Sequence, residues 1–397
     1  MSNHNPSMSR RATLATGSGL LIMRPENAFG YPANSAVNFG IIGTGGRGRY
    51  VGKEMVNDGR TQLVAICDIY PDRLDAAKTQ IPKSDQAKSY KNHEEMLGHA
   101  GLDAVLIATP VYLHPLHFEA AVKAKKHIYC EKPAGADVAG VKRLLRAGMK
   151  ADKSKTIQFG FQQRFSKEYL YGEQIIKDGK LGKVTHVESY WILGNPPPAA
   201  FKSPYPESEQ KVRHWGMWME TSGGAIVEQD CHGVDVLNWF GGSAPVKAYG
   251  IAGLRYPLPY GDWNSDHHNI TYTYANGTTG WLLSVKHTAG FRDVKERVYG
   301  SQGMLELARI YMKWHGPQGD YRFKSADNLS DRSLIEMRES KYDITVDAVK
   351  HFFTSIIDNK PFHMTQEAAD ATLAALLGRM AYEKKREVTM AELMKSA

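Results

Sequence analysis

The sequence predicts an α/β protein in which a doubly wound parallel sheet is followed by an α+β unit with a mostly antiparallel, open sheet. Its length of 397 residues exceeds the usual size of one domain, so two hydrophobic cores are expected. Short apolar runs alternate with helical patterns in the first part of the chain, which is typical of a parallel sheet. From about residue 184 longer β-prone stretches follow, separated by Gly, Asn and Pro turns.

The first unit, placed at residues 37–160, should be a nucleotide-binding sheet with a helix after most strands. Its expected strands begin with the apolar run VNFGII and lie at 37–42, 61–68, 102–110, 127–133 and 156–164. The first helix opens in the glycine turn after the first strand, and further helices are expected at 72–80, 93–100, 114–125 and 137–152.

The second unit, placed at residues 161–397, should carry substrate binding and oligomerisation. Strands are expected in 184–193, 268–287 and 296–307, with a hairpin turn at the Asn276-Gly277 pair. Helices are expected at 345–358 and 365–385. The proline-rich stretch 193–208 is a lid, an oligomer arm or a connector. An open sheet of this kind favours a homodimer or homotetramer.

Composition is that of a soluble globular protein, because 42% hydrophobic and 23% charged residues exclude a disordered chain and a multispanning membrane protein. The net charge of +8 is interspersed with acidic residues. We therefore expect a mildly basic surface that does not bind nucleic acid, with an anionic substrate left open. Cys67, Cys130 and Cys231 show no paired spacing and are interpreted as buried thiols.

The first 36 residues have the outline of an export leader. Two arginines in SRRATL, residues 9–14, precede a moderately apolar run, and small residues follow at 28–30. This pattern is typical of a twin-arginine signal, whose passengers are exported folded and commonly carry a cofactor. We expect a periplasmic or otherwise exported protein that binds its cofactor before export. The alternative is a basic tail on a cytoplasmic protein.

A glycine-rich turn at residues 43–48, GTGGRG, predicts a dinucleotide-binding Rossmann fold, because it follows an apolar strand and opens a helix. Gly43 is expected to make the tight turn, Gly45 to admit the pyrophosphate and Gly48 to allow close helix packing. The helix N-terminus then offers backbone amides to the phosphates. The cofactor residues expected in this turn are Gly43, Gly45, Gly46, Arg47 and Gly48.

Further cofactor contacts are expected at the carboxyl edge of the parallel sheet. Asp68 stands 25 residues after Gly43, where its carboxylate would bind the adenosine ribose and favour NAD over NADP, although nearby Arg73 leaves NADP open. Lys132 follows a buried strand and would stand beside the nicotinamide, where a lysine can donate to a substrate oxygen. Further cofactor residues expected at this edge are Thr109, Pro110, His114, Glu131 and Pro133.

The stretch VEQDCH, residues 227–232, places a carboxylate four residues before a histidine. On one helix, Glu228 and His232 would share a face about one turn apart. A histidine steadied by a carboxylate suits the abstraction of a hydroxyl proton. The alternatives are a structural histidine capped by glutamate, and a zinc site that adds Asp230 and His214, although no metal-binding spacing accompanies them.

Aromatic and polar residues of the second unit are candidates for the substrate pocket, since aromatic faces suit sugar rings and arginine suits hydroxyl or carboxylate groups. The alternative for each of them, taken alone, is a structural role as a core aromatic or a surface arginine. The expected substrate residues are Lys132, Arg164, Tyr190, His214, Trp215, Asp230 and His232.

Taken in order, the motifs GTGGRG, AICD, ATPVYLH, CEKPAG, the Gly-Gly-then-carboxylate-His stretch and VYGSQGMLEL resemble the Gfo/Idh/MocA family of nicotinamide-dependent sugar and polyol oxidoreductases. The resemblance covers nearly the whole chain after about residue 37. It implies that Lys132 is the active-site lysine and that Pro133 is a proline often preceded by a cis peptide. It also implies that His232 is the acid/base of an Asp-x-x-x-His signature.

The sequence departs from the family pattern beside His232. Glu228 stands where aspartate is usual, and Asp230 where glycine is usual. Asp235, three residues after His232, matches the family's aspartate there. The departures weaken any transfer of a substrate from well-studied members.

The expected activity is hydride transfer between a tightly bound NAD(P) and a sugar, polyol or glycoside carbinol, catalysed by Lys132, His232 and Glu228. An exported enzyme has no NAD pool to exchange with, so the cofactor should be regenerated in place. The alternative is a redox-neutral glycoside hydrolase that oxidises the sugar transiently at C3. A sugar-sensing protein on a dehydrogenase scaffold is a third hypothesis, which retention of Lys132 and His232 argues against.

Overall fold

A computed structural model describes residues 36–199, 202–316, 334–338 and 343–396 of the chain. The expected leader, apart from Ala36, lies outside these residues. The fold below concerns the compact unit that begins at Val37.

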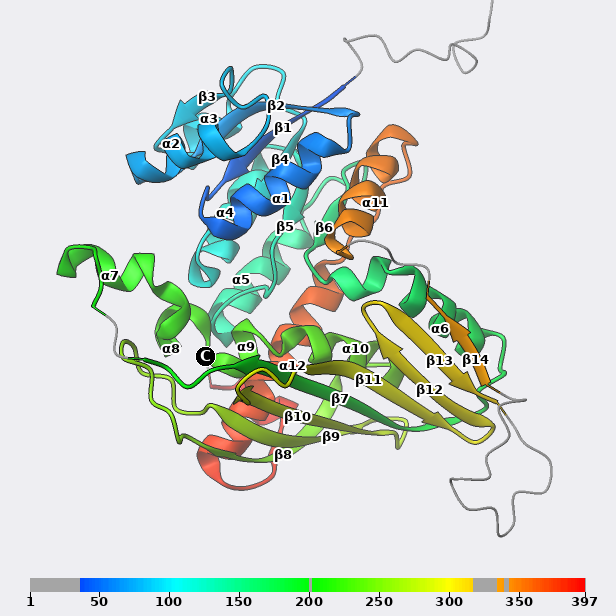
Figure 1. Ribbon diagram of the computed structural model, residues 1–397. Helices are drawn as coiled ribbons and strands as arrows, with labels where there is room; N and C mark the ends of the chain where they lie inside the picture. Colours follow the sequence, from blue (N-terminus) through cyan, green and yellow to red (C-terminus); the bar gives the residue numbers. More distant parts are fainter. Residues whose placement is uncertain (1–35, 200–201, 317–333, 339–342, 397) are drawn as a thin grey trace, which may run out of the picture. The chain divides into compact units, whose positions relative to one another are not determined.

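A six-stranded parallel sheet forms the first layer, in the order β3-β2-β1-β4-β5-β6 (Figure 1). Its strands are β1 (Val37–Ile42), β2 (Thr61–Cys67), β3 (Lys88–Tyr90), β4 (Ala104–Ile107), β5 (His127–Cys130) and β6 (Ile157–Phe159). The helices are α1 (Gly46–Asn57), α2 (Pro71–Gln80), α3 (His93–Leu97), α4 (His114–Lys123) and α5 (Val138–Gly148). The predicted doubly wound sheet is confirmed, with strands and helices that end earlier than the apolar patterns at several places.

A nine-stranded mixed sheet forms the second part, in the order β14-β13-β12-β11-β7-β10-β9-β8-β15. Its strands are β7 (Val184–Asn195), β8 (Pro245–Gly253), β9 (His267–Tyr274), β10 (Thr279–His287), β11 (Asp293–Gly300), β12 (Gly303–Ala308), β13 (Tyr311–His315), β14 (Leu334–Met337) and β15 (Val388–Thr389). Among the described residues, its strand pairings are antiparallel except that of β7 with β10. The predicted hairpin is present, and Gly277 takes φ +85° in its turn.

The helices after β6 are α6 (Lys167–Lys177), α7 (Glu207–Arg213), α8 (Met219–Ser222), α9 (Ala225–Glu228), α10 (Cys231–Gly241), α11 (Thr345–Ile357), α12 (Thr365–Lys384) and α13 (Met390–Met394). Of these, α6, α10, α12 and α13 contact the strands of the mixed sheet. In Figure 1, α10 and α12 run along the sheet, and each contacts its strands. Both are largely buried, because α10 is apolar nearly all round and α12 is rich in small Ala residues.

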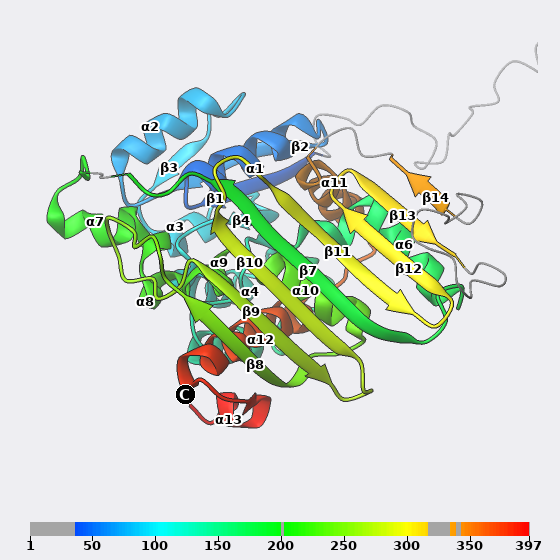
Figure 2. The same cartoon turned by 60° about the horizontal axis from the view of Figure 1, so that its bottom comes forward.

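The opposite face of the mixed sheet has no helix in front of it where Figure 2 shows β7 to β13. Strand β10 follows a strict alternation in which Leu282, Ser284 and Lys286 point to the helices and the intervening residues point to this open face. The expectation that the open sheet packs against a second copy of the chain stays a prediction.

Helix α11 returns to the parallel sheet although it is far away in sequence. The ring of Phe353 packs against Phe39 of β1 with centroids 6.0 Å apart, and Phe352 packs against Tyr129 of β5 at 5.6 Å. Helix α11, which the sequence analysis assigned to the second unit, therefore completes the core of the first.

The three cysteines are buried free thiols, as predicted.

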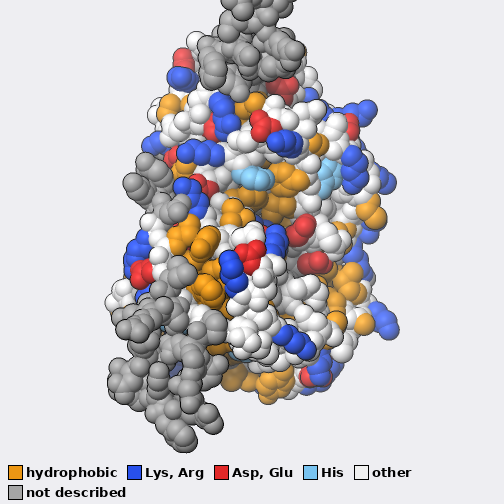
Figure 3. Space-filling model, turned by 90° about the vertical axis from the view of Figure 1, so that its right-hand side faces the viewer, with side chains coloured by type: hydrophobic (Ala, Val, Ile, Leu, Met, Phe, Trp, Pro, Cys, Tyr) orange, Lys and Arg blue, Asp and Glu red, His pale blue; other side chains and the backbone are white. Residues whose placement is uncertain are grey.

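On the face shown in Figure 3, where the residues are described, Lys and Arg side chains are scattered among Asp, Glu and apolar ones and form no continuous basic field. Within the described ranges, no helix combines the length and hydropathy needed to cross a membrane.

Replacing Phe353 with alanine should destabilise the fold, because it removes a fully buried ring that joins α11 to β1. We expect the free energy of unfolding to fall by about 3–5 kcal/mol in urea titrations followed by circular dichroism. Phe291→Ala, at a ring that is 63% exposed, is the matched control and should change it by less than about 0.5 kcal/mol. Equal losses in the two variants would contradict this account of the core.

Candidate active site

The glycine turn after β1 has the geometry that a dinucleotide requires. Gly43 takes φ +91°, which only glycine adopts readily, and its backbone lies against the carbonyl of Ala108. A Cβ added to Gly48 would stand 1.9 Å from the carbonyl oxygen of Gly43, so the third glycine allows α1 to approach the turn. Cβ positions at Gly45 and Gly46 meet nothing within 4 Å, which leaves their backbone open to a ligand.

Asp68 is fixed at the end of β2 beside this turn. Its carboxylate accepts hydrogen bonds from the Thr44 amide at 2.9 Å, the Thr44 hydroxyl at 3.2 Å and the Tyr70 amide at 3.1 Å. These bonds aim the carboxylate at the rim of a cavity of about 230 Å³. The cavity is lined by predicted cofactor residues Gly43, Gly45, Gly46, Asp68, Arg73, Thr109 and Pro110, with Tyr70, His93, His117, Val212, Arg213 and Trp215 among the others.

These residues fit NAD, since open glycine amides stand at the start of a helix and a carboxylate stands at the end of the neighbouring strand. The cavity residues Val212, Arg213 and Trp215 belong to the segment around α7, outside the parallel-sheet unit. Trp215 is among the predicted site residues, whereas Val212 and Arg213 are additional lining residues that the sequence analysis did not name.

The predicted cofactor residue His114 lies behind the cavity lining. The His114 ring is almost fully buried, and its nitrogens lie 2.8 Å from the Pro133 carbonyl and 2.9 Å from the Thr109 carbonyl. Burial lowers the pKa of His114. Because neither nitrogen faces the cavity, His114 holds two loops together, which corrects its assignment as a direct cofactor contact.

An ion pair joins the start of α1 to the end of β5, with Nε of Arg47 3.0 Å from Oε1 of Glu131. Glu131 is buried and also packs against Gly160. These two residues and Gly48 lie next to the cavity rather than in its lining, so their contribution to cofactor binding is through the shape of the turn and its charge.

Lys132 crosses to the second part of the chain. Its peptide bond to Pro133 is cis, as the family resemblance implies. Its ammonium donates to the backbone carbonyl of Glu228 and lies 3.3 Å from Oε1 of the same residue. Burial by itself would lower the pKa of Lys132, but the nearby groups Glu228, Cys231 and Glu131 together raise it above its usual value, so the lysine is a cation at neutral pH.

The structure corrects the predicted Glu228 and His232 pair. Helix α9 ends at Glu228 and α10 starts at Cys231, so the two residues do not lie on one continuous helix. Glu228 turns to Lys132, and no hydrogen bond joins it to His232 in the described part of the chain. Gly223 and Gly224 both have positive φ before α9, and such a broken path is not visible in an i to i+4 pattern.

The imidazole of His232 is held by aromatic rings instead of a carboxylate. It stacks on Trp191 of β7 with centroids 5.5 Å apart and planes 15° apart, and it meets Phe161 edge-on at 6.1 Å. Its Nδ1 is buried, and the described residues offer it no partner. Burial, then the charges of Lys132, Arg309 and Arg47, lower the pKa of His232 well below its usual value, which keeps the ring neutral and able to accept a proton.

Asp230 lies between Glu228 and His232 in sequence and is fully buried. It accepts a hydrogen bond from the ammonium of Lys286, and its Oδ2 lies 2.5 Å from Nε2 of His268. Burial by itself would raise the pKa of Asp230, but Lys286 and His268 hold it below its usual value. Asp230 is therefore an anchor for α10, not the direct substrate contact that the sequence suggested.

Lys286 and His268 are functional candidates that sequence reasoning missed. Both occupy inward positions of alternating strands, Lys286 with Leu282 in β10 and His268 with Ile270 in β9. A polar residue at a core position of an alternating strand requires a partner. This strand parity was the available signal.

A second cavity of about 320 Å³ adjoins this group. Its wall combines two indoles with an acid, a cation, an imidazole and an amide: Trp215, Trp263, Glu228, Lys286, His287 and Asn195, with Gln229, Gly216, Met217 and Leu258. Trp215 lines both cavities. The second cavity therefore offers aromatic faces and hydrogen-bonding groups, and its lining residue Glu228 contacts Lys132.

Two of the other predicted substrate residues are placed elsewhere, which corrects their assignment. Arg164 makes a bidentate pair with buried Asp235, with N to O distances of 2.8 Å, and lies over the Trp239 ring. Tyr190 points to the open face of the sheet, where it packs on Trp281 with centroids 5.5 Å apart. Adjacent strand residues point to opposite faces, so Tyr190 and the inward Trp191 cannot serve one pocket.

His214 lies beside the site without lining either cavity. Its Nε2 lies 3.0 Å from the Ser203 hydroxyl, and its ring stacks on Tyr260 at 5.6 Å. The zinc hypothesis joined His214 to Glu228, Asp230 and His232. Over the described residues no three His, Cys, Asp or Glu side chains form a group that could hold a metal ion.

Lys286, Asp230 and His268 form a buried triad. Removing the Lys286 cation should destabilise the fold, because it leaves the Asp230 carboxylate buried with His268 as its partner. We expect Lys286→Met to lower the free energy of unfolding by about 3–5 kcal/mol at pH 8. The loss should be smaller near pH 5, where a protonated His268 can replace the missing charge. Chemical denaturation at both pH values measures it, and Lys313→Met on β13 is a control outside the triad. A loss in Lys286→Met that does not depend on pH would contradict the role of His268.

Comparisons with known proteins agree with this geometry. Residues 37–161 match the Gfo/Idh/MocA profile described as an oxidoreductase family with an NAD-binding Rossmann fold. Residues 169–306 match the Gfo/Idh/MocA C-terminal domain.

Similar proteins span nearly the whole chain. A myo-inositol 2-dehydrogenase of Thermotoga maritima is 24% identical over 368 residues, which cover 90% of this chain and 100% of that protein. The structure of a scyllo-inositol dehydrogenase from Lactobacillus casei with bound NAD(H) and scyllo-inositol matches with a TM-score of 0.66 and 23% identity, over 90% of this chain and 99% of that one. A levoglucosan dehydrogenase in complex with NADH and levoglucosan matches with a TM-score of 0.72 and 17% identity, over 89% and 99% of the two chains.

Proposed function

The chain belongs to the Gfo/Idh/MocA family of NAD-binding oxidoreductases, and on that basis we propose that it oxidises a secondary alcohol of a cyclic polyol or sugar. The observation that carries the proposal is that Lys132 bonds to Glu228, which lines the second cavity, and stands near enough to neutral His232 for its charge to lower the pKa of that ring. Bound NAD supplies the acceptor for the hydride of the carbinol carbon.

The lysine and the histidine divide the proton chemistry between them. Lys132 is a cation and donates a hydrogen bond to the substrate oxygen, which stabilises the negative charge that develops there. His232 is neutral and accepts the hydroxyl proton as the carbonyl forms. Glu228 keeps the ammonium of Lys132 in place and charged, so its role is positioning.

The second cavity supports a polyhydroxylated substrate. Trp215 and Trp263 provide aromatic faces of the kind that pack against sugar rings, while Lys286, Glu228 and Asn195 provide donors and acceptors for hydroxyl groups. The relatives named as inositol and levoglucosan dehydrogenases act on ring alcohols by their names, which agrees with this choice of substrate.

Export and permanent retention of the cofactor are further parts of the proposal. They rest on the SRRATL stretch at residues 9–14 and on the requirement that an exported enzyme regenerate NAD in place. Fractionation of the native host, followed by detection of the protein with bound cofactor in the exported fraction, tests them.

The first test is chemical. Purified protein is denatured and the supernatant is assayed for NAD(H), and intact protein is then incubated with inositols, levoglucosan and aryl glycosides. We expect about one cofactor per chain and a keto product from a cyclic polyol or sugar, detected by mass spectrometry as a loss of two hydrogens. Release of the aglycone without net oxidation would replace this proposal with the redox-neutral glycoside reaction. Absence of both cofactor binding and turnover would remove the enzymatic proposal.

Variants of the two central residues should separate their roles. Lys132→Met and His232→Ala should each lower kcat by about 10²–10⁴-fold while NAD stays bound. In wild type, the acidic limb of the kcat/KM profile should lie below pH 6.5, because burial and nearby cations lower the pKa of His232. In Lys132→Met that limb should move to higher pH, since one cation that opposes imidazolium formation is gone. A limb at the same pH in both proteins would assign it to another group.

A further inference from the structure

We propose that Arg213 closes the adenosine end of the nucleotide cavity and keeps the dinucleotide bound through many turnovers. The clasp consists of Arg213 and Tyr205 on one side and of Tyr70, Asp72 and Arg73 on the other. The inference rests on the proposed binding of NAD and adds the residues that set its residence time.

The guanidinium of Arg213 lies between two tyrosine rings. Its Cζ is 3.7 Å from the centroid of Tyr70 and 4.3 Å from that of Tyr205. Tyr70 follows β2, whereas Tyr205 and Arg213 lie in the segment that contains α7, so the stack joins distant parts of the chain. Planar guanidinium groups stack well on aromatic faces, and lysine does not reproduce this contact.

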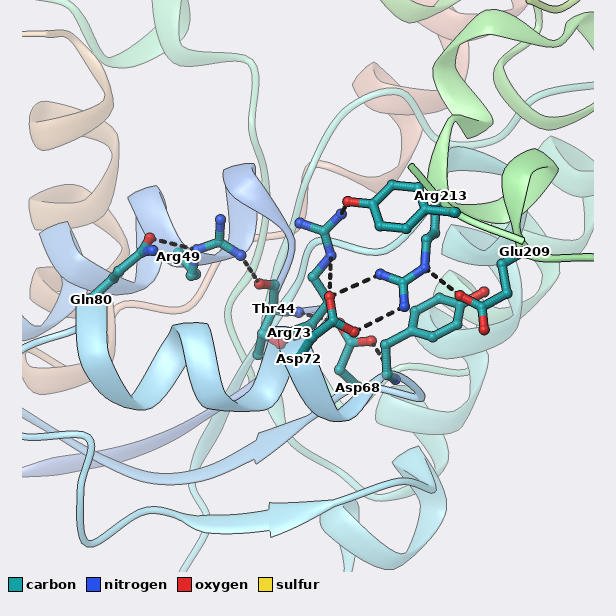
Figure 4. Close-up of polar contacts among 10 residues, drawn as sticks. Thr44, Arg49, Asp68, Asp72, Arg73, Gln80, Glu209 and Arg213 are labelled. Carbon is teal, nitrogen blue, oxygen red and sulfur yellow. Dashed lines mark hydrogen bonds and ion pairs between the residues drawn. The ribbon is translucent and has the colours of Figure 1, made fainter. Parts of the chain in front are cut away.

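The edge of the same guanidinium is fixed by two carboxylates (Figure 4). Its terminal nitrogens donate to both oxygens of Asp72 at 2.9 Å, and its Nε donates to Glu209 at 2.6 Å. The Arg213 side chain is only 7% exposed although Asp72 is 55% exposed. A bidentate pair between planar groups, with the guanidinium covered, is held more specifically than an ordinary surface ion pair.

The clasp is continuous with the wall of the cavity. Tyr70, Arg73 and Arg213 line it together with Asp68, and the Tyr70 amide is bound to the Asp68 carboxylate. Arg73 donates to the Tyr205 hydroxyl at 3.4 Å and so adds a second link between the two sides. The clasp therefore stands directly beside the carboxylate that would bind the ribose.

Release of the cofactor past this wall requires the α7 segment to separate from Tyr70 and Asp72. That separation breaks a bidentate hydrogen-bonded pair and exposes a stacked guanidinium, so the structure slows dissociation without touching the reacting atoms. Trp215, two residues after Arg213, lines both cavities. The clasp is therefore close in sequence to the wall that the nucleotide cavity and the second cavity share. Substrate and product can exchange in the second cavity while the clasp stays closed.

The test measures cofactor dissociation directly. Protein loaded with NADH is mixed with a large excess of NAD⁺, and the loss of bound-NADH fluorescence gives the dissociation rate. We expect Arg213→Ala and Asp72→Asn each to accelerate release at least 10-fold, with their effects not additive because both break one pair. Arg213→Lys should resemble Arg213→Ala more than wild type. Arg143→Ala, which breaks the exposed Arg143 and Glu119 pair, is the matched control and should release NADH at the wild-type rate.

The outcomes separate the clasp from the proposed function. If wild type binds no NADH, the proposed function fails and the clasp proposal fails with it. If wild type binds NADH and Arg213→Ala, folded by circular dichroism, releases it at the same rate, only the clasp is overturned. Should Arg213→Ala not fold, Asp72→Asn and Tyr205→Leu decide, and wild-type release rates in both would overturn the clasp.

Discussion

One buried carboxylate fixes the part of the chain on which the site depends. Asp230 is fully buried, and its charge is compensated by Lys286 from β10 and His268 from β9. An uncompensated charge there would cost several kcal/mol of folding free energy, so Asp230 requires both a cation and a hydrogen-bond partner around it. Asp230 lies where the chain is interrupted between α9 and α10; Glu228 before it contacts Lys132, and His232 after it stacks on Trp191.

Near this interruption, reactive side chains from two distant parts of the chain lie close together. Lys132 follows a strand of the parallel sheet, whereas His232 opens a helix on the mixed sheet. One group is a cation and the other a neutral base, and each is kept so by its surroundings rather than by contact with the other. The nucleotide cavity and the polar, aromatic cavity share the lining residue Trp215.

Sequence reasoning failed where the path of the backbone was assumed. The spacing of Glu228 and His232 suggested one helical face, but the helix is interrupted. Tyr190 was placed in the pocket although its neighbour Trp191 is the inward residue, and strand alternation separates the two. Arg164 suited a substrate carboxylate by charge, but Asp235 already occupies its guanidinium. Lys286 was overlooked because a lysine in a strand is ordinarily exposed.

Features that depend on neighbours in the chain can be predicted from the sequence. Apolar periodicity predicts the alternating strands and helices, and GTGGRG after an apolar strand predicts the nucleotide turn, because turn chemistry and helix packing there are local. The pairs between distant residues become visible in the folded chain alone. Asp230 meets Lys286 across 56 positions and Arg213 meets Asp72 across 141, and such contacts follow from sheet order and from how segments fold back, which residue spacing does not encode.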